Sequence, residues 1–207
     1  KWAASASFLD ADCSFAGPLE SAASLGVMKN FRITILTVFS FLFLSAFTLI
    51  ALEHYEVTQD FSLEFKSKDP SGSFKKMEGQ IEFDEKDLSK CSFDLKIDVR
   101  SISTGNGMMT KKSQTPEWFD AVKFPYAKFK STKVEKKEAN TYNIFGNLTI
   151  KGVTKPVTVP ATYSKAGNKI TLKGTFFVNR LDFKVGKKSE AVPDQMKVNF
   201  EIPALSK

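Results

Sequence analysis

From residue 55 onward, apolar and polar residues alternate along the chain with a period of two. In the segment from Cys91 to Val99, every second residue is apolar and the residues between are polar or charged. This alternation is typical of a strand with one buried face and one solvated face. The same pattern recurs at 61–66, 81–83, 142–150, 157–163, 170–178 and 196–202. Sequences typical of turns separate these segments, and the count comes to about eight strands.

Eight strands of this kind predict an all-β fold. A two-sheet sandwich and a closed antiparallel barrel both satisfy one apolar face on every strand. We expect the barrel, because closure removes the exposed edges that a sheet otherwise has to protect. The interior of an eight-stranded barrel can be filled by side chains or can hold one slender ligand.

The connection 102–126 breaks the alternation. Thr115 followed by Pro116 predicts the start of a short helix there, with Thr115 as the capping residue. The same connection carries three large apolar residues, Trp118, Phe119 and Phe124. A long connection of this composition is typical of a functional loop, and we expect a short helical lid over the barrel mouth.

The segment before the barrel has the organisation of a targeting sequence. Met28 is followed by Lys29 and Arg32, and then by an apolar run at 33–51. A short basic region before an apolar core indicates a signal peptide at 28–52. An uncleaved anchor is the alternative, because the run is nearly long enough to span a bilayer. We interpret residues 1–27 as an upstream extension outside the functional protein and 56–207 as the barrel domain.

Composition leaves the nature of the interior open. The chain of 207 residues contains 20 Phe, which fills a core as readily as it lines a cavity. The net charge of +7 favours anionic partners. The lysines are scattered along predicted strand faces, so we expect no nucleic-acid partner.

The sequence lacks the residues that a known type of catalytic site or a metal site would need. The sequence has one His, His54, and two Cys, Cys13 and Cys91. These cannot supply a catalytic triad or a zinc site. No glycine-rich phosphate loop is present either. We therefore predict no catalytic residues, no metal ligands, no cofactor and no enzymatic activity.

Five segments, in order, resemble the YceI-like family of secreted, lipocalin-like proteins: 74–83, 97–105, 118–125, 146–157 and 179–186. The resemblance implies an eight-stranded antiparallel lipocalin-like barrel with a lipid along its axis, of the polyisoprenoid type. It also implies a periplasmic or secreted location in bacteria, with attachment through 33–51 if that segment is retained. Family members often carry an Arg-Asp-x-His-Leu stretch before the Phe-Asp motif. This chain has Met109 to Thr115 there, with neither the His nor the acidic residue.

The main hypothesis is a protein that binds, carries or sequesters a long-chain amphiphile. The predicted inward-facing lipid contacts are Phe65, Phe83, Phe93, Leu95, Ile97, Leu148, Ile150, Phe176, Val178 and Phe200. Trp118, Phe119 and Phe124 are expected at the entrance, and Lys151, Lys155 and Arg180 at an anionic headgroup. We expect a long-chain lipid as partner, transient membrane contact, and a monomer or homodimer. A ligand-free structural or stress-response envelope module with a filled core is the alternative.

Overall fold

The structure is a computed structural model that describes residues 53–67 and 70–207. The predicted extension at 1–27 and the predicted signal peptide or anchor at 28–52 lie outside the described residues. In the part of the chain that is described, no helix is long and apolar enough to cross a membrane.

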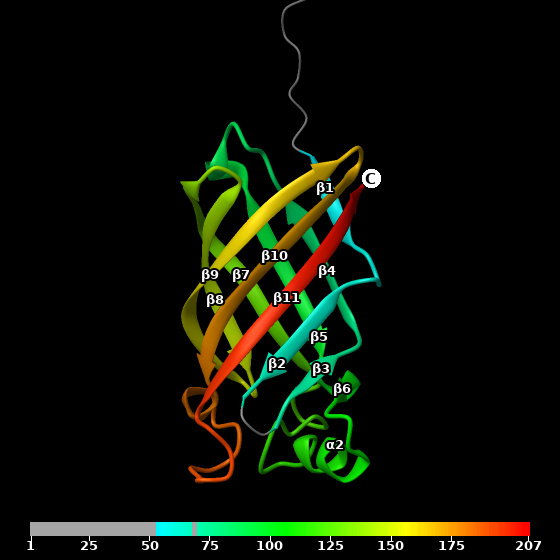
Figure 1. The fold of residues 1–207 in the computed structure, drawn as a ribbon, viewed down its shortest axis with the longest axis vertical. Coiled ribbons are helices and arrows are strands. Elements are labelled where there is room, and N and C mark those ends of the chain that lie inside the picture. The colour runs from blue at the N-terminus through cyan, green and yellow to red at the C-terminus, as the bar shows by residue number, and fades with distance from the viewer. Residues whose placement is uncertain (1–52, 68–69) are drawn as a thin grey trace, which may run out of the picture. The chain divides into compact units, whose positions relative to one another are not determined.

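The described residues form eleven strands and one α-helix, joined by short turns and 3₁₀ helices (Figure 1). The strands are β1 His54–Val57, β2 Ser62–Lys66, β3 Gly72–Phe74, β4 Met77–Glu82, β5 Ser92–Asp98, β6 Ile102–Ser103, β7 Tyr126–Glu138, β8 Thr141–Ile150, β9 Val153–Ala166, β10 Lys169–Asn179 and β11 Gln195–Ser206. The helix is α2, Gly107–Ser113. The 3₁₀ helices are η1 Leu88–Lys90, η2 Val99–Ser101 and η3 Arg180–Phe183.

These strands make an eight-stranded barrel because the first three strands of the barrel are each interrupted. β1 and β2 form one interrupted strand, β3 and β4 the next, and β5 and β6 the third. β7 to β11 follow as five continuous strands, each antiparallel to its neighbour. β11 then pairs with both β1 and β2, which closes the barrel. The predicted eight-stranded antiparallel barrel with a short helical lid is confirmed.

The turns follow from their sequences. Lys151 and Gly152 connect β8 to β9, and both have positive φ, 50° and 74°. A two-residue hairpin turn of type I′ requires positive φ at both central positions, which glycine adopts without strain. Asn140, in the turn between β7 and β8, has φ of 59°, which asparagine tolerates better than most residues.

The helix lies upstream of the predicted position, so the prediction of a helix capped by Thr115 is wrong. The Asn106 side chain accepts hydrogen bonds from the backbone N–H groups of Met108 and Met109, at 2.9 and 3.1 Å, and this caps α2 at Gly107. The Thr115 hydroxyl instead donates to the Lys112 carbonyl at 2.7 Å, so it cannot act as a cap in the expected way. Residues 116–119 form a turn, which we call the lid turn.

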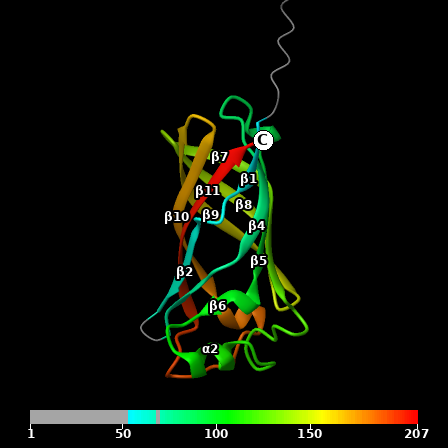
Figure 2. The same ribbon diagram turned by 90° about the vertical axis from the view of Figure 1, so that its right-hand side faces the viewer.

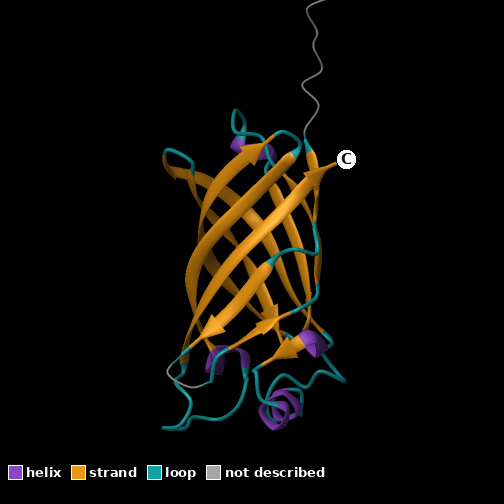
Figure 3. Ribbon diagram, turned by 45° about the vertical axis from the view of Figure 1, so that its right-hand side comes forward, coloured by secondary structure: helices purple, strands orange, loops and turns teal. Residues whose placement is uncertain are grey.

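The two ends of the barrel differ. The chain terminus labelled C lies at one end, and α2 lies at the other together with the loop that joins β10 to β11 (Figures 1 and 2). Figure 3 shows helical segments gathered at this second end, below the strands. We call it the helical end. Because the lid elements gather there, the helical end is where an opening to the interior is expected.

Candidate functional site

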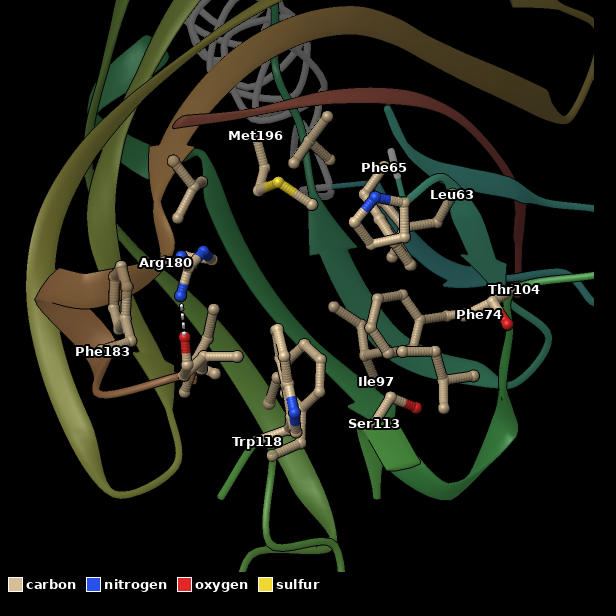
Figure 4. Close-up of a pocket in the computed structure, with 18 of the residues that line it drawn as sticks. Leu63, Phe65, Phe74, Ile97, Thr104, Ser113, Trp118, Arg180, Phe183 and Met196 are labelled. Carbon is tan, nitrogen blue, oxygen red and sulfur yellow. Dashed lines mark hydrogen bonds between the residues drawn. The ribbon is translucent and has the colours of Figure 1, made fainter. Parts of the chain in front are cut away.

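A cavity of about 240 Å³ lies inside the barrel at the helical end (Figure 4). Figure 4 shows Arg180 and Phe183 on one side of it and Leu63, Phe65 and Phe74 on the other. The apolar lining residues are Leu63, Phe65, Pro70, Phe74, Ile97, Ile102, Met109, Trp118, Phe119, Ala127, Leu148, Ile150, Phe176, Val178, Phe183, Val185, Val192, Met196 and Val198. The polar and charged ones are Glu64, Thr104, Lys112, Ser113 and Arg180.

The cavity occupies only the half of the interior that is nearer the helical end. Along β11, Met196 and Val198 line it, whereas the next inward residues, Phe200 and Ile202, are packed in the core. β8 divides in the same way, since Leu148 and Ile150 line the cavity and its earlier inward residues do not. The strands therefore provide an open half and a filled half of one interior.

Aromatic side chains fill the half of the barrel interior that is nearer the C-terminus. Phe83 stacks on Tyr163 with ring centroids 4.4 Å apart, and meets Tyr142 edge-on at 5.1 Å. Tyr55 is fully buried in the same core. Burial raises the pKa of the Tyr55, Tyr142 and Tyr163 hydroxyls above the usual tyrosine value, because it disfavours the charged phenolate. Within the part of the chain that the structure describes, no tyrosine lines the open half.

The wall and the lid of the cavity meet through aromatic contacts. Phe65 of β2 and Phe74 of β3 have ring centroids 5.9 Å apart, and Phe74 meets Phe119 edge-on at 6.0 Å. Phe119 is held by its backbone N–H, which donates to the Ser113 carbonyl at 3.0 Å. The end of α2 therefore fixes an aromatic side chain over the interior, as a lid requires.

Arg180 is the buried charge of the site, with 4% of its surface exposed. Its Nε and Nη2 donate to the carbonyls of Pro193 and Val192 at 3.0 and 2.9 Å, and Nη1 donates to the Val185 carbonyl at 3.0 Å. Nη2 also bonds the Asp194 carboxylate at 3.0 Å. These bonds hold the loop between η3 and β11 against the barrel end. A guanidinium has five N–H groups, so one N–H on Nη1 has no partner among the described residues.

Trp118 lies beside this guanidinium, whose central carbon is 5.7 Å from the indole centroid. Gly186 (φ 69°) lets the two side chains approach, because a Cβ there would lie 2.9 Å from Trp118 and 3.0 Å from Nη1. The buried Trp118 Nε1 has no hydrogen-bond partner in the described part of the chain. One N–H group of Arg180 and the Trp118 indole N–H therefore have no partner among the described residues, and the indole nitrogen is enclosed by protein.

Eight of the thirteen predicted lipid contacts line the cavity: Phe65, Ile97, Trp118, Phe119, Leu148, Ile150, Phe176 and Val178. Phe83, Phe93 and Leu95 face inward but belong to the filled half. Phe200 packs beside the cavity on Phe176, at 6.2 Å between ring centroids. Phe124 instead packs against Gly152 in the β8–β9 turn.

The three predicted headgroup residues have separate surroundings. Arg180 lines the cavity, whereas Lys155 is exposed on β9. The Lys151 ammonium donates to the carbonyls of Pro116, Glu117 and Lys184, at 2.8, 3.3 and 2.9 Å. Burial lowers the pKa of Lys151, because it disfavours the charged form. Lys151 therefore ties the lid turn to η3 and does not reach the cavity.

The sequence reasoning missed several lining residues. Met196, Val198 and Leu63 lie on predicted inward faces, so the alternation could have found them. Val185 and Val192 lie in the loop after η3, which carries no periodic signal. No cluster of three or more His, Cys, Asp or Glu side chains placed to hold a metal occurs within residues 53–67 and 70–207.

A closed eight-stranded antiparallel barrel with an apolar cavity under a lid places the chain among the small single-domain β-barrels. The sequence model of the YceI-like domain matches residues 49–204. The chain therefore belongs to the YceI-like family.

Relatives and solved structures agree with this assignment. UPF0312 protein YE1254 of Yersinia enterocolitica is 39% identical over 97 residues, and Protein YceI of Salmonella arizonae is 40% identical over 97 residues. Each match covers 47% of this chain, and the chain spans about half the length of these curated relatives (50%).

Among solved structures, BcnA of Burkholderia cenocepacia is similar with a TM-score of 0.66 and 31% identity, over 69% of this chain and 95% of BcnA. The YCEI protein of Campylobacter jejuni has a TM-score of 0.63 and 26% identity, over 69% and 88%. A polyisoprenoid binding domain from Saccharophagus degradans has a TM-score of 0.58 and 14% identity, over 75% and 99%, which shows a shared fold.

Proposed function

We propose that this barrel binds the apolar chain of an amphiphile in the cavity at the helical end and carries or sequesters it outside the cytoplasm. The apolar lining of that cavity is the observation that carries the proposal. Each methylene moved from water into such a cavity stabilises the complex by about 0.8 kcal/mol. An apolar chain can therefore bind tightly with few polar contacts.

A polyisoprenoid is the ligand we favour. Membership of the YceI-like family and the fold shared with a polyisoprenoid binding domain support this choice. A periplasmic or secreted location is part of the proposal and is supported by the family and by the signal-like sequence at 28–52. We propose a binding protein with no catalytic step.

The polar end of the ligand would lie beside Arg180 and Trp118. Arg180 keeps one N–H group without a partner, and the Trp118 indole N–H has none among the described residues. The free Arg180 N–H is a charged donor on the cavity lining, which suits a hydroxyl or phosphate oxygen, and Trp118 lies beside it. Lys112 at the cavity rim adds positive charge.

Transfer to and from a membrane would occur at the helical end. Met108 on α2 is 81% exposed, and Val122, in the loop after the lid turn, is 95% exposed. Lys111, Lys112 and Lys123 lie next to them in the sequence and are exposed. Exposed apolar side chains among lysines suit transient contact with an anionic bilayer.

Organic extraction of the purified protein, followed by mass spectrometry, tests the proposal. We expect a co-purifying long-chain lipid, or binding of a polyisoprenoid alcohol by the delipidated protein. The variant Met196→Trp, which places an indole in the cavity, should retain less lipid. Leu205→Trp, on the exposed face of the same strand at the other end, is the matched control. A folded protein that yields no lipid and binds none contradicts the proposal.

A further inference from the structure

Two phenylalanines mark the level at which the cavity ends. Phe129 of β7 is directly opposite Leu148 in the sheet, and Phe200 of β11 is directly opposite Leu63. Leu148 and Leu63 line the cavity, whereas Phe129 and Phe200 do not, although both are buried. β7 and β11 are four strands apart in a barrel of eight, so the two rings come from opposite walls.

Each ring is seated against a glycine of the neighbouring strand. A Cβ at Gly174, which pairs with Phe200, would lie 2.5 Å from the Phe200 ring. A Cβ at Gly146 would lie 2.6 Å from the Phe129 ring. Only glycine permits such close contact between a ring and the backbone of the next strand. Both rings therefore lie close to the backbone of the neighbouring strand, at the level where the packed half of the interior begins.

Beyond this level the interior is packed. The next inward residues, Ile202 after Phe200 and Leu172 before Gly174, are buried in the core, as are Phe93 and Ile144. Further along stands the aromatic cluster of Phe83, Tyr142 and Tyr163. An apolar chain that enters from the helical end therefore meets packed side chains about halfway along the barrel.

The depth of the open half sets a length. β11 begins at Gln195 and reaches Phe200 five residues later, which at ~3.3 Å per residue and a strand tilt of ~40° gives a depth of about 13 Å. An isoprene unit places four carbon–carbon bonds in line, each about 1.5 Å long, and so extends for about 5 Å. The cavity volume of about 240 Å³ lies below the usual range of drug-sized ligand pockets, ~300–1,000 Å³.

We propose that the packed half of the interior, which begins at the level of Phe129 and Phe200, acts as a length stop, so that the cavity accepts an apolar segment of about two to three isoprene units. This inference rests on the proposed function and adds the ligand class: a short prenyl chain, or the terminal part of a longer one whose remainder stays outside the cavity.

Binding of geraniol, farnesol and geranylgeraniol to the delipidated full chain, measured by displacement of a fluorescent apolar probe, tests the stop. Affinity should rise by at least about tenfold from geraniol to farnesol, because the added unit is buried. It should change by less than about threefold from farnesol to geranylgeraniol, because the fourth unit finds no room. A further tenfold gain at geranylgeraniol would overturn the proposal.

Variants locate the stop. Phe200→Leu and Phe200→Ala should tighten geranylgeraniol binding at least about fivefold, because the smaller side chains open space at the inner end of the cavity. The affinity for geraniol should stay within about twofold of the wild-type value. Phe93→Ala removes the same ring from the filled half and should leave the length preference unchanged. Thermal melting identifies any variant that fails to fold, and Phe200→Leu is the milder change.

The outcomes distinguish failure of the length stop from failure of the proposed lipid-binding function. Binding of all three alcohols with no break in the series, or with a break that Phe200→Leu and Phe200→Ala do not move, overturns the stop and leaves the lipid-binding function standing. If the folded protein binds none of the three and yields no lipid on extraction, the proposed function and the length stop both fail.

Discussion

At the scale of single residues, Arg180 shows how a buried charge can hold a loop of the barrel end in place. Most of its N–H groups bond to the loop between η3 and β11, which supplies Val185 and Val192 to the cavity wall. Because the guanidinium is planar and presents several donors at once, it can satisfy these carbonyls in a way that an ammonium cannot.

Arg180→Lys should therefore lower the free energy of unfolding by about 3 kcal/mol, because buried carbonyls and the Asp194 carboxylate lose their partner. Arg100→Lys is the matched control. Its guanidinium also bonds an aspartate, Asp98, at 2.8 Å, but the Arg100 side chain is 54% exposed. We expect that change to cost much less stability, because solvent screens the exposed ion pair. Urea unfolding of both variants measures the difference, and equal losses would contradict the structural role of Arg180.

Phe176 and Phe93 separate a cavity wall from a filled core. Phe93→Ala should destabilise the protein by about 3–5 kcal/mol, because the ring leaves a hole in packed surroundings. Phe176→Ala should cost at least about 1 kcal/mol less, since its ring already borders open space, and should weaken lipid binding more. Paired chemical denaturation and lipid-binding measurements compare them. A loss of stability at Phe176 as large as that at Phe93 would favour the ligand-free module.

The sequence predicted which residues of each strand face the interior. It did not predict how far along the barrel axis each of them lies. The period-two pattern places Phe83 and Phe176 inward with equal weight. Only the structure shows that Phe83 is stacked on Tyr163 whereas Phe176 borders the cavity. The position of a side chain along the barrel axis depends on the register between strands, and its packing depends on the sizes of the side chains that face it. The sequence of a single strand does not encode either.

At the scale of elements, α2 and the lid turn determine the surroundings of the cavity mouth. The sequence indicated a long functional connection with Trp118 and Phe119 but misplaced its helix. Thr115-Pro116 and Asn106-Gly107 both suit a helix start, and the Asn106 cap is the one formed. Local sequence could not choose between them, because the choice depends on which segment packs under the barrel.

Met108→Asp combined with Val122→Asp should weaken binding of the protein to vesicles of anionic phospholipid, because charge replaces exposed apolar surface beside the lysines of the helical end. Leu205→Asp is the matched control, since Leu205 is 40% exposed at the opposite end of the barrel. Vesicle co-sedimentation at low and moderate salt measures the effect. Equal binding by the double variant and the control would show that the membrane is met elsewhere.

At the scale of the whole molecule, the alternation and the turn sequences predicted about eight strands but allowed both a sandwich and a barrel. The protection of strand edges and the resemblance to the YceI-like family favoured the barrel. The sequence pattern could not reveal that three of the strands are interrupted. Residues 58–61, Lys75-Lys76 and η2 each divide a strand into two parts that still follow one another in the barrel.

The filled half of the interior makes the stability of the protein depend on pH in the alkaline range. Tyr55, Tyr142 and Tyr163 have raised pKa values in the folded protein.

Groups with raised folded-state pKa values stabilise the protein fully below the unfolded-state pKa, about 10 for tyrosine, and lose that contribution as pH rises above it. The free energy of unfolding should thus fall above pH ~10, by up to about 1.4 kcal/mol per pH unit for each such tyrosine. Urea midpoints across this range measure the slope.

Tyr142→Phe should make that fall shallower. Because the Tyr142 hydroxyl has no hydrogen-bond partner among the described residues, the variant should also gain about 1 kcal/mol at neutral pH. Tyr126→Phe removes a hydroxyl from a more exposed ring and is the control. An unchanged slope in Tyr142→Phe would contradict the assignment.

Closure of the barrel between its first and last strands has a kinetic consequence. β11 pairs with β10 on one side and with β1 and β2 on the other, so β11 completes the pairing on both of its sides. The contacts across β1 and β11 join residues about 150 positions apart, and contacts of such sequence separation form slowly. These contacts cannot form before β11 has been synthesised. The cavity is therefore among the last features of the barrel to form during folding.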